Sequence, residues 1–196
     1  MTTTRHGGTG NTRLARHLSL LLAVDIQERL APHVEGNEAL IERTRALVTA
    51  ARRFGIARRL TEHCPTQIGP VVAAVREGFT PDEIFNKTHF GATDHPEFVA
   101  LLRATGAEHI VVAGMEAHVC VMQTVLGLLD EGFRVTAVAD AIGARRARQA
   151  DRLWALERMR AAGATLAGTE TVLFEWTHSG NDPEFRAILQ LVKDLP

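Results

Sequence analysis

The sequence predicts a three-layer α/β/α domain, in which helices cover both faces of a six-stranded, mostly parallel sheet. Two observations lead to this prediction. Short aliphatic and β-branched runs alternate along the chain with longer amphipathic stretches, which is typical of strand and helix units wound around a parallel sheet. The runs at 18–24 and 109–114 are almost entirely apolar, as expected for strands covered on both faces.

The expected elements follow one another in a regular order. Strands are expected at 18–24, 57–61, 84–87, 109–114, 133–139 and near 165. Helices are expected at 37–54, near 71, and at 95–104, 119–131, 148–162 and 183–192. Gly55 and Gly132 follow two of these helices, where glycine commonly ends a helix, and Asp94 is expected to cap the helix that starts at 95. With right-handed crossovers, these units form a Rossmann-like sheet with strand order 3-2-1-4-5-6.

The length of the chain favours a single domain. A chain of 196 residues with 45% hydrophobic residues is long enough to bury one core and short enough to form one unit. Residues 1–17 are rich in Thr, Gly and Arg and lack apolar periodicity, so we expect a flexible N-terminal tail there. The folded domain is then expected to span 18–196.

The composition argues against several classes of partner. The 22 basic and 23 acidic side chains nearly cancel, so no overall field favours nucleic acid or an anionic membrane. No apolar run reaches the roughly 20 residues that span a bilayer. The two cysteines, Cys64 and Cys120, are too few for a disulfide framework and fit a reducing compartment. We therefore expect a cytoplasmic protein that binds neither nucleic acid nor membranes.

Three chemically reactive side chains follow three different predicted strands. Asp25 comes directly after the first strand, Lys87 ends the third, and Cys120 lies shortly after the fourth. In an open parallel sheet, ligands bind at the carboxyl ends of the strands, near the point where the strand order reverses. An acid, an amine and a thiol are therefore expected to meet at one edge of the sheet.

These residue types can supply the parts of a nucleophilic mechanism. Cys120 is expected at a helix N-terminus, where the helix dipole stabilises a thiolate, and a nearby Lys87 ammonium would lower the pKa of the thiol further. Asp25 could accept the thiol proton and return it to a leaving group. Free backbone N–H groups at the helix start could stabilise an oxyanion.

Each of the three residues also has an ordinary structural explanation. A cysteine after a strand is commonly a small buried hydrophobe. An aspartate at a strand end is commonly a turn or cap residue, and a loop lysine is commonly solvated. The three residues taken singly leave both interpretations open, and it is their convergence at one sheet edge that favours a site.

Three segments resemble the isochorismatase-like, or cysteine hydrolase, superfamily. They are 21–30 (LLAVDIQERL), 86–90 (NKTHF) and 114–124 (GMEAHVCVMQT), and the third is the most specific. The resemblance runs in order from about Leu18 to the C-terminal helix. The stretches 114–141 and 171–176 are most similar to the branch that contains YcaC-like hydrolases and isochorismatase-domain-containing proteins.

The resemblance implies a role for each matching residue. Asp25 corresponds to the general acid/base of the family, Lys87 to its lysine and Cys120 to its nucleophile. A cis peptide bond is implied between Met115 and Glu116. The oxyanion hole would then be formed by the backbone amides of Glu116 and Cys120.

The implied activity is hydrolysis of a small amide or other C–N bond through a thioester on Cys120, without a cofactor. Residues 61–70 contain one histidine, His63, and lack the Asp-x-His spacing of metal-binding nicotinamidases, so no metal is expected. An ester or thioester hydrolase with the same three residues is the nearest alternative. A non-catalytic scaffold and a thiol sensor are further alternatives. Relatives commonly form dimers or larger rings, so a homo-oligomer acting on a small molecule is expected.

Five further residues are candidates for the wall of the substrate pocket. They are Gln27, His89, Phe90, His118 and Trp176. Each of them also fits a role in packing or at the surface. Asp140, at the end of the fifth expected strand, is expected to cap a helix.

Overall fold

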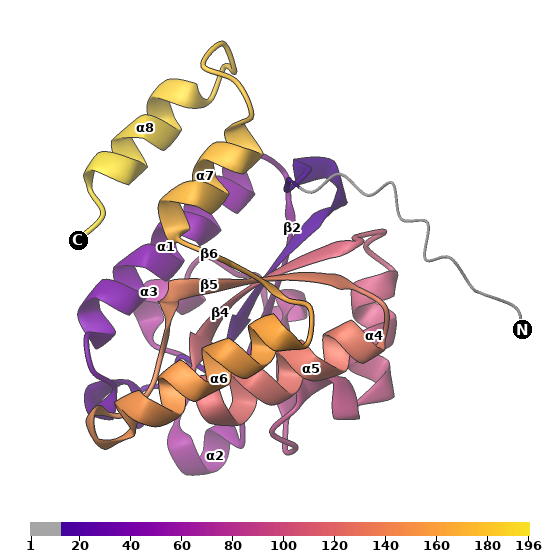
Figure 1. Cartoon of the computed structure of the whole chain (residues 1–196), viewed down its shortest axis with the longest axis vertical. Helices are drawn as coiled ribbons and strands as arrows, with labels where there is room; N and C mark the ends of the chain where they lie inside the picture. Colours follow the sequence, from indigo (N-terminus) through magenta and orange to yellow (C-terminus); the bar gives the residue numbers. More distant parts are fainter. Residues whose placement is uncertain (1–12) are drawn as a thin grey trace, which may run out of the picture.

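A six-stranded parallel sheet forms the centre of the computed structural model, which describes residues 13–196 (Figure 1). The strands are β1 (Ser19–Val24), β2 (Ala57–His63), β3 (Ile84–Lys87), β4 (His109–Met115), β5 (Arg134–Gly143) and β6 (Thr165–Ala167). Every neighbouring pair is parallel, and the order is β3-β2-β1-β4-β5-β6. The predicted fold class and strand order are therefore confirmed.

Helices cover both faces of the sheet (Figure 1). One face packs against α1 (Asn37–Arg53), α3 (Ala73–Arg76), α7 (Thr169–Thr177) and α8 (Phe185–Lys193). The other packs against α4 (Pro96–Arg103), α5 (Met122–Asp130) and α6 (Gln149–Ala161). The short α2 (Pro65–Ile68) follows β2, and 3₁₀ turns occur at Arg16–Leu18, Ala31–His33, Pro81–Glu83, Ala92–Asp94 and Arg146–Arg148.

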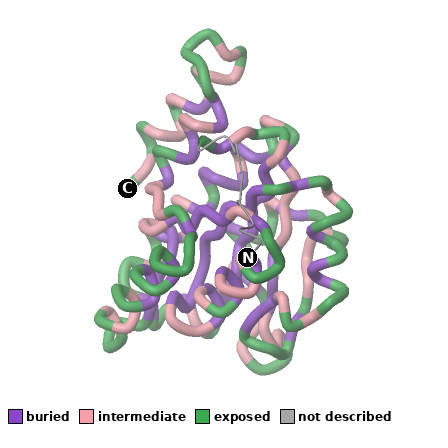
Figure 2. Tube along the Cα trace, turned by 45° about the vertical axis from the view of Figure 1, so that its right-hand side comes forward, coloured by how far each residue is buried: buried purple, intermediate pink, exposed green. Residues whose placement is uncertain are grey.

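The two cores are separated by the alternation of side chains along the central strands. In β1, Leu21 and Ala23 join the core under α1 and α7, whereas Leu20 and Leu22 join the core under α4 and α5. All residues of β1 and β4 are buried, and Figure 2 shows the buried chain concentrated in the interior. A continuous apolar run therefore marks a strand covered on both sides, as the sequence predicted.

The ordered domain begins earlier than expected. Leu14 is buried, and its backbone N–H donates a hydrogen bond of 2.8 Å to the Glu175 carboxylate in α7. Arg16 forms an ion pair of 2.7 Å with Asp182, in the loop after α7. The expected tail over 1–17 is thus wrong for residues 13–17, because these contacts hold them against the C-terminal part of the chain. The rest of that prediction, residues 1–12, lies outside the described residues.

Of the two aspartates that were expected to cap helices, Asp140 does so and Asp94 does not. Asp94 does not cap α4, which starts at Pro96 with His95 as the preceding residue. Proline fits the first position of a helix because it needs no N–H there, and this places the start after Asp94. Asp140 lies within β5, which is longer than expected, and its carboxylate accepts hydrogen bonds of 2.8 and 2.9 Å from the N–H and hydroxyl of Thr169. Asp140 thereby caps α7, a helix that the sequence analysis did not predict.

The helices were also searched for a membrane span. Within residues 13–196, no helix is both long enough and apolar enough to cross a bilayer.

Candidate active site

The three reactive residues meet at the carboxyl edge of the sheet. Asp25 follows β1, Lys87 ends β3, and Cys120 lies in a single π-helical turn, Ala117–Val121, between β4 and α5. Asp25 and Cys120 open onto a cavity of about 200 Å³. The cavity is lined by Asp25, Leu30, His63, Ile68, Phe90, Glu116, Val119, Cys120 and Arg145.

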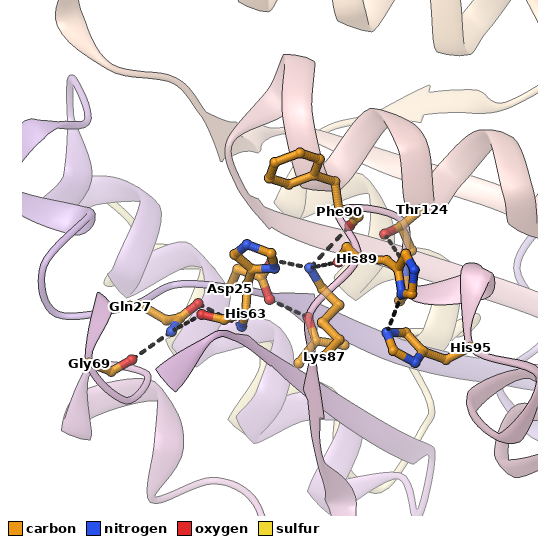
Figure 3. A network of polar contacts seen from close by, with 11 residues as sticks. Asp25, Gln27, His63, Gly69, Lys87, His89, Phe90, His95 and Thr124 are labelled. Carbon is orange, nitrogen blue, oxygen red and sulfur yellow. Dashed lines mark hydrogen bonds and ion pairs between the residues drawn. The ribbon is translucent and has the colours of Figure 1, made fainter. Parts of the chain in front are cut away.

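Asp25 is held by both its backbone and its side chain. Its φ of +50° is left-handed, a conformation that aspartate tolerates better than most residues, and its N–H donates to the carbonyl of Thr61 at 3.1 Å. The Thr61 hydroxyl donates to Asp25 Oδ1 at 2.7 Å, and Lys87 Nζ lies 2.6 Å from Oδ2 (Figure 3). Since the residue is only 1% exposed, both carboxylate oxygens depend on these partners.

Lys87 is a buried cation with three oxygen partners. Besides the Asp25 carboxylate, its ammonium donates to the backbone carbonyls of His89 at 3.2 Å and Phe90 at 3.0 Å. A buried charge is tolerated in proteins when it is paired and hydrogen-bonded, and this set of partners meets both conditions. The ordinary interpretation of Lys87 as a solvated loop residue is wrong, because its side chain is completely buried.

Cys120 is a thiol at rest, contrary to the expected thiolate. Burial raises the pKa of Cys120 to about 12, the negative charge of Asp25 and hydrogen bonding to its carboxylate act in the same direction, and Lys87 acts against them. The expectation of a lowered pKa is wrong because the helix start is covered rather than open to solvent, leaving the residue 7% exposed. A sulfur nucleophile at this position therefore has to lose its proton to a base during the attack.

The raised pKa of Cys120 can be tested by following the ultraviolet absorbance of its thiolate against pH. The measurement is best made in a Cys64→Ser background, in which Cys120 is the only cysteine. Thiolate absorbance from Cys120 should be absent in the wild-type site below about pH 10, because a pKa of about 12 keeps the thiol protonated there. Asp25→Asn removes a negative charge that raises the pKa, so its thiolate should form at lower pH. Lys87→Met removes a positive charge that lowers the pKa of Cys120, so its thiolate should form at higher pH than in the wild type. The chain has no tyrosine, so the ultraviolet titration is free of tyrosinate. Equal curves for the three proteins would contradict this electrostatic assignment.

The peptide bond between Met115 and Glu116 is cis, as the resemblance implied. The Glu116 side chain is buried at the cavity wall, where Arg145 Nε donates to its two carboxylate oxygens at 2.9 and 2.6 Å. Arg145 follows β5, so this ion pair joins the loops after two neighbouring strands. The guanidinium is half exposed and places a positive charge at the mouth of the cavity.

Of the five pocket candidates, Phe90 lines the cavity. The other four do not. Gln27 is buried, and its amide bonds the backbone of His63 and Gly69. His89 is exposed and contacts His95 with its ring. These two residues serve the structure around the site rather than its wall.

His118 and Trp176 also lie outside the cavity. His118 Nε2 lies 3.6 Å from the carboxylate of Glu116, which lines the cavity, but His118 itself is not part of the lining. Trp176 is fully buried in α7, and its indole N–H donates to the hydroxyl of Ser19 at 3.2 Å. Ser19 begins β1 and Asp25 follows its end, so Trp176 packs at the opposite end of the strand from the site.

Several wall residues were not predicted from the sequence. Leu30, Ile68 and Val119 supply apolar surface, and Arg145 supplies charge. Leu30 and Val119 belong to the segments that carry the family resemblance, which is the only sequence signal for them. Among residues 13–196, no three His, Cys, Asp or Glu side chains are grouped so that they could hold a metal ion.

The parallel sheet with a buried acid, lysine and cysteine at its carboxyl edge is a hydrolase-type α/β fold. The chain belongs to the isochorismatase family, because residues 19–171 match the model of the Isochorismatase domain. It is 33% identical over 184 residues to isochorismatase domain-containing protein 2 of Danio rerio, covering 93% of this chain and 91% of that protein.

Solved structures show the same fold. MAR1 ribonuclease from Caenorhabditis elegans matches with a TM-score of 0.87 and 31% identity, over 94% of each chain. YcaC from Pseudomonas aeruginosa, solved with hexane-2,5-diol and covalent acrylamide, matches with a TM-score of 0.86 and 30% identity, over 93% of this chain and 92% of that one. YcaC from Escherichia coli is described as an octameric hydrolase of unknown specificity. It matches with a TM-score of 0.83 and 26% identity, over 95% of this chain and 99% of that one. The chain is therefore similar to the YcaC-like branch.

Proposed function

We propose that the protein is a cysteine hydrolase that cleaves a small amide, or another C–N bond, through a thioester on Cys120. The observation that carries the proposal is the buried cluster of Asp25, Lys87 and Cys120, of which Asp25 and Cys120 line one cavity. A base next to a nucleophile, itself held by a third group, is the arrangement that nucleophilic catalysis requires. A scaffold or a thiol sensor would have no use for the acid in this position.

Acylation begins as the Cys120 sulfur attacks the carbonyl carbon of the substrate. The thiol proton passes to Asp25 while the C–S bond forms, and the carbonyl electrons move to oxygen. The backbone amides of Glu116 and Cys120 stabilise that oxyanion. The intermediate then collapses, the C–N bond breaks, and the departing nitrogen takes the proton from Asp25. Lys87 offsets the charge of Asp25 when the carboxylate is ionised.

Deacylation completes the cycle. Water adds to the carbonyl carbon of the thioester and gives one proton to a base at the site, the C–S bond breaks, and the acid product leaves. The sulfur regains a proton, which restores the resting thiol of Cys120.

The cavity favours a small substrate with an apolar part. Its volume of about 200 Å³ is below the range of roughly 300–1,000 Å³ that holds drug-sized ligands. Leu30, Ile68, Phe90 and Val119 give it apolar walls. One of the similar structures is named a ribonuclease, but the net charge of −1 in this chain provides no general attraction for a polyanion.

Two findings on relatives support the proposal. A YcaC protein has been solved with covalent acrylamide, an electrophile that thiols attack, and we propose the same reactivity for Cys120. The octameric state of another YcaC protein supports a homo-oligomer for this chain as well. Leu153 and Trp154 on α6 are large apolar side chains at the surface that such an assembly would cover.

The test is turnover of a panel of small amides, with esters of the same acids measured in parallel. Cys120→Ser and Asp25→Asn should each lower amide turnover by about 10³-fold or more, since each removes a group that reacts directly. Cys64→Ser is the matched control and should retain activity. Turnover of esters alone would favour the ester hydrolase, and full activity of Cys120→Ser would exclude a thioester route.

A further inference from the structure

His63 is an additional ionisable side chain on the wall of the active-site cavity. It ends β2, and its imidazole lies beside the pair of Asp25 and Lys87 (Figure 3). The ring stacks on Phe90, with centroids 5.2 Å apart and an angle of 30° between the planes. Both rings line the cavity that holds Cys120. The imidazole therefore faces the space in which a thioester would form.

Gln27 fixes the position of His63. Its side-chain amide donates to the His63 carbonyl at 3.0 Å and accepts from the His63 N–H at 2.9 Å. The same amide nitrogen donates to the carbonyl of Gly69 at 2.5 Å. Since Gln27 is fully buried, this pairing holds the end of β2 in one place. The buried glutamine next to the catalytic acid thus orients His63 rather than a substrate.

The imidazole has the ionisation state and the free atom that a base requires. Burial and the positive charge of Lys87 lower the pKa of His63, with Asp25 and the His89 carbonyl acting in the opposite direction, so the ring is neutral near pH 7. Its Nδ1 is buried and has no hydrogen-bond partner within residues 13–196. A buried nitrogen without a partner calls for an explanation, and a turn of the ring toward the cavity would let Nδ1 bond a water or substrate there.

Asp25 is less well placed to act on water. Its Oδ1 accepts from Thr61, its Oδ2 contacts Lys87, and the residue is 1% exposed. His63 lies on the wall of that cavity, and a turn of its ring would bring Nδ1 to water that enters.

We propose that His63 is a catalytic residue that accepts a proton from the water that hydrolyses the Cys120 thioester, with Gln27 as its positioning residue. This inference rests on the proposed function. The water oxygen bonds to the thioester carbon as one of its protons passes to the imidazole. The resulting oxyanion collapses, the C–S bond breaks, and the carboxylic acid leaves. The imidazolium then returns its proton to the sulfur, so that thiol and neutral imidazole are both restored.

Burst kinetics with p-nitrophenyl acetate separate the two half-reactions. Acylation of Cys120 releases nitrophenolate in an initial burst, and later turnover reports hydrolysis of the acetyl thioester. His63→Phe keeps the ring and its stack on Phe90 but removes both nitrogens. It should retain the burst, lower the later rate by about 10²-fold or more, and accumulate protein that carries one acetyl group by mass spectrometry. His89→Phe, at an exposed ring outside the cavity, is the matched control and should behave as wild type.

A second variant distinguishes a chemical from a structural role. His63→Ala opens space beside the acyl group, and added imidazole should restore its deacylation but not that of His63→Phe, where the space is filled. Rescue of neither variant, or a wild-type deacylation rate in both, would overturn the role of His63. Failure of the wild-type protein to release nitrophenolate, or release that persists in Cys120→Ala, would instead overturn the proposed function.

Discussion

Replacing Lys87 by methionine is expected to lower the free energy of unfolding by about 3–5 kcal/mol and to abolish turnover. Methionine keeps much of the side-chain volume but removes the charge, which leaves the Asp25 carboxylate buried without its ion-pair partner. Loss of one member of a buried pair is far more costly than loss of the whole pair, because the remaining charge is left without compensation. Both side chains here are at most 1% exposed. Urea denaturation at a fixed protein concentration measures the effect, since an oligomer is stabilised by mass action.

Two variants make the Lys87 measurement specific. Arg160→Met breaks the pair of Arg160 and Glu157 at the surface of α6, where both side chains are more than half exposed, and should lower the free energy of unfolding far less than Lys87→Met does. Lys87→Met combined with Asp25→Asn removes both charges and should recover part of the lost stability, giving a coupling energy of about 1 kcal/mol or more. A loss in Lys87→Met no larger than that in Arg160→Met would contradict the assignment of a buried, mutually dependent pair.

The sequence was sufficient to predict the sheet and the three residues at its edge, for a simple reason. An unbroken apolar run such as 18–24 needs cover on both faces, so it marks a central strand, and the residue that follows it lies at the carboxyl edge. This rule positions Asp25, whereas Lys87 ends the less apolar strand 84–87, whose place in the sheet follows from the alternation of strands and helices along the chain. The family segments added the cis bond before Glu116, which no pattern of hydrophobicity could indicate.

What could not be predicted depends on contacts between distant parts of the chain. The pKa of Cys120 is set by burial, and a position near a helix start does not reveal that burial. Arg145 pairs with Glu116 across 29 residues of sequence. Trp176 fits a pocket wall or a core equally well by sequence, because a large aromatic ring can serve in either place. Its position is set by the packing of α7 against α1 and β5.

Gly114→Ala is expected to lower stability by about 3 kcal/mol or more and to impair the site. Gly114 has a φ of +139°, and a Cβ there would lie 2.1 Å from the carbonyl oxygen of Val24 and 2.8 Å from two further backbone atoms of that residue. The clash involves backbone, so no side chain can rotate to relieve it. Val24 and Gly114 are partners in the ladder between β1 and β4, and the two central strands would have to separate locally.

The consequences of that separation reach the proposed catalytic groups through the chain itself. Asp25 directly follows Val24, and Glu116 lies two residues after Gly114, so a shift of either strand moves the acid relative to the proposed oxyanion hole. Gly132→Ala is the matched control, because Gly132 also has a positive φ, +83°, but its added Cβ would meet nothing within 4 Å. It should show only the backbone penalty, about 1 kcal/mol. Thermal and urea unfolding of both variants would measure the difference. A similar loss of stability in the two variants would mean that the strands move apart at little cost. The requirement for glycine at position 114 would then have a cause other than the close approach of β1 and β4.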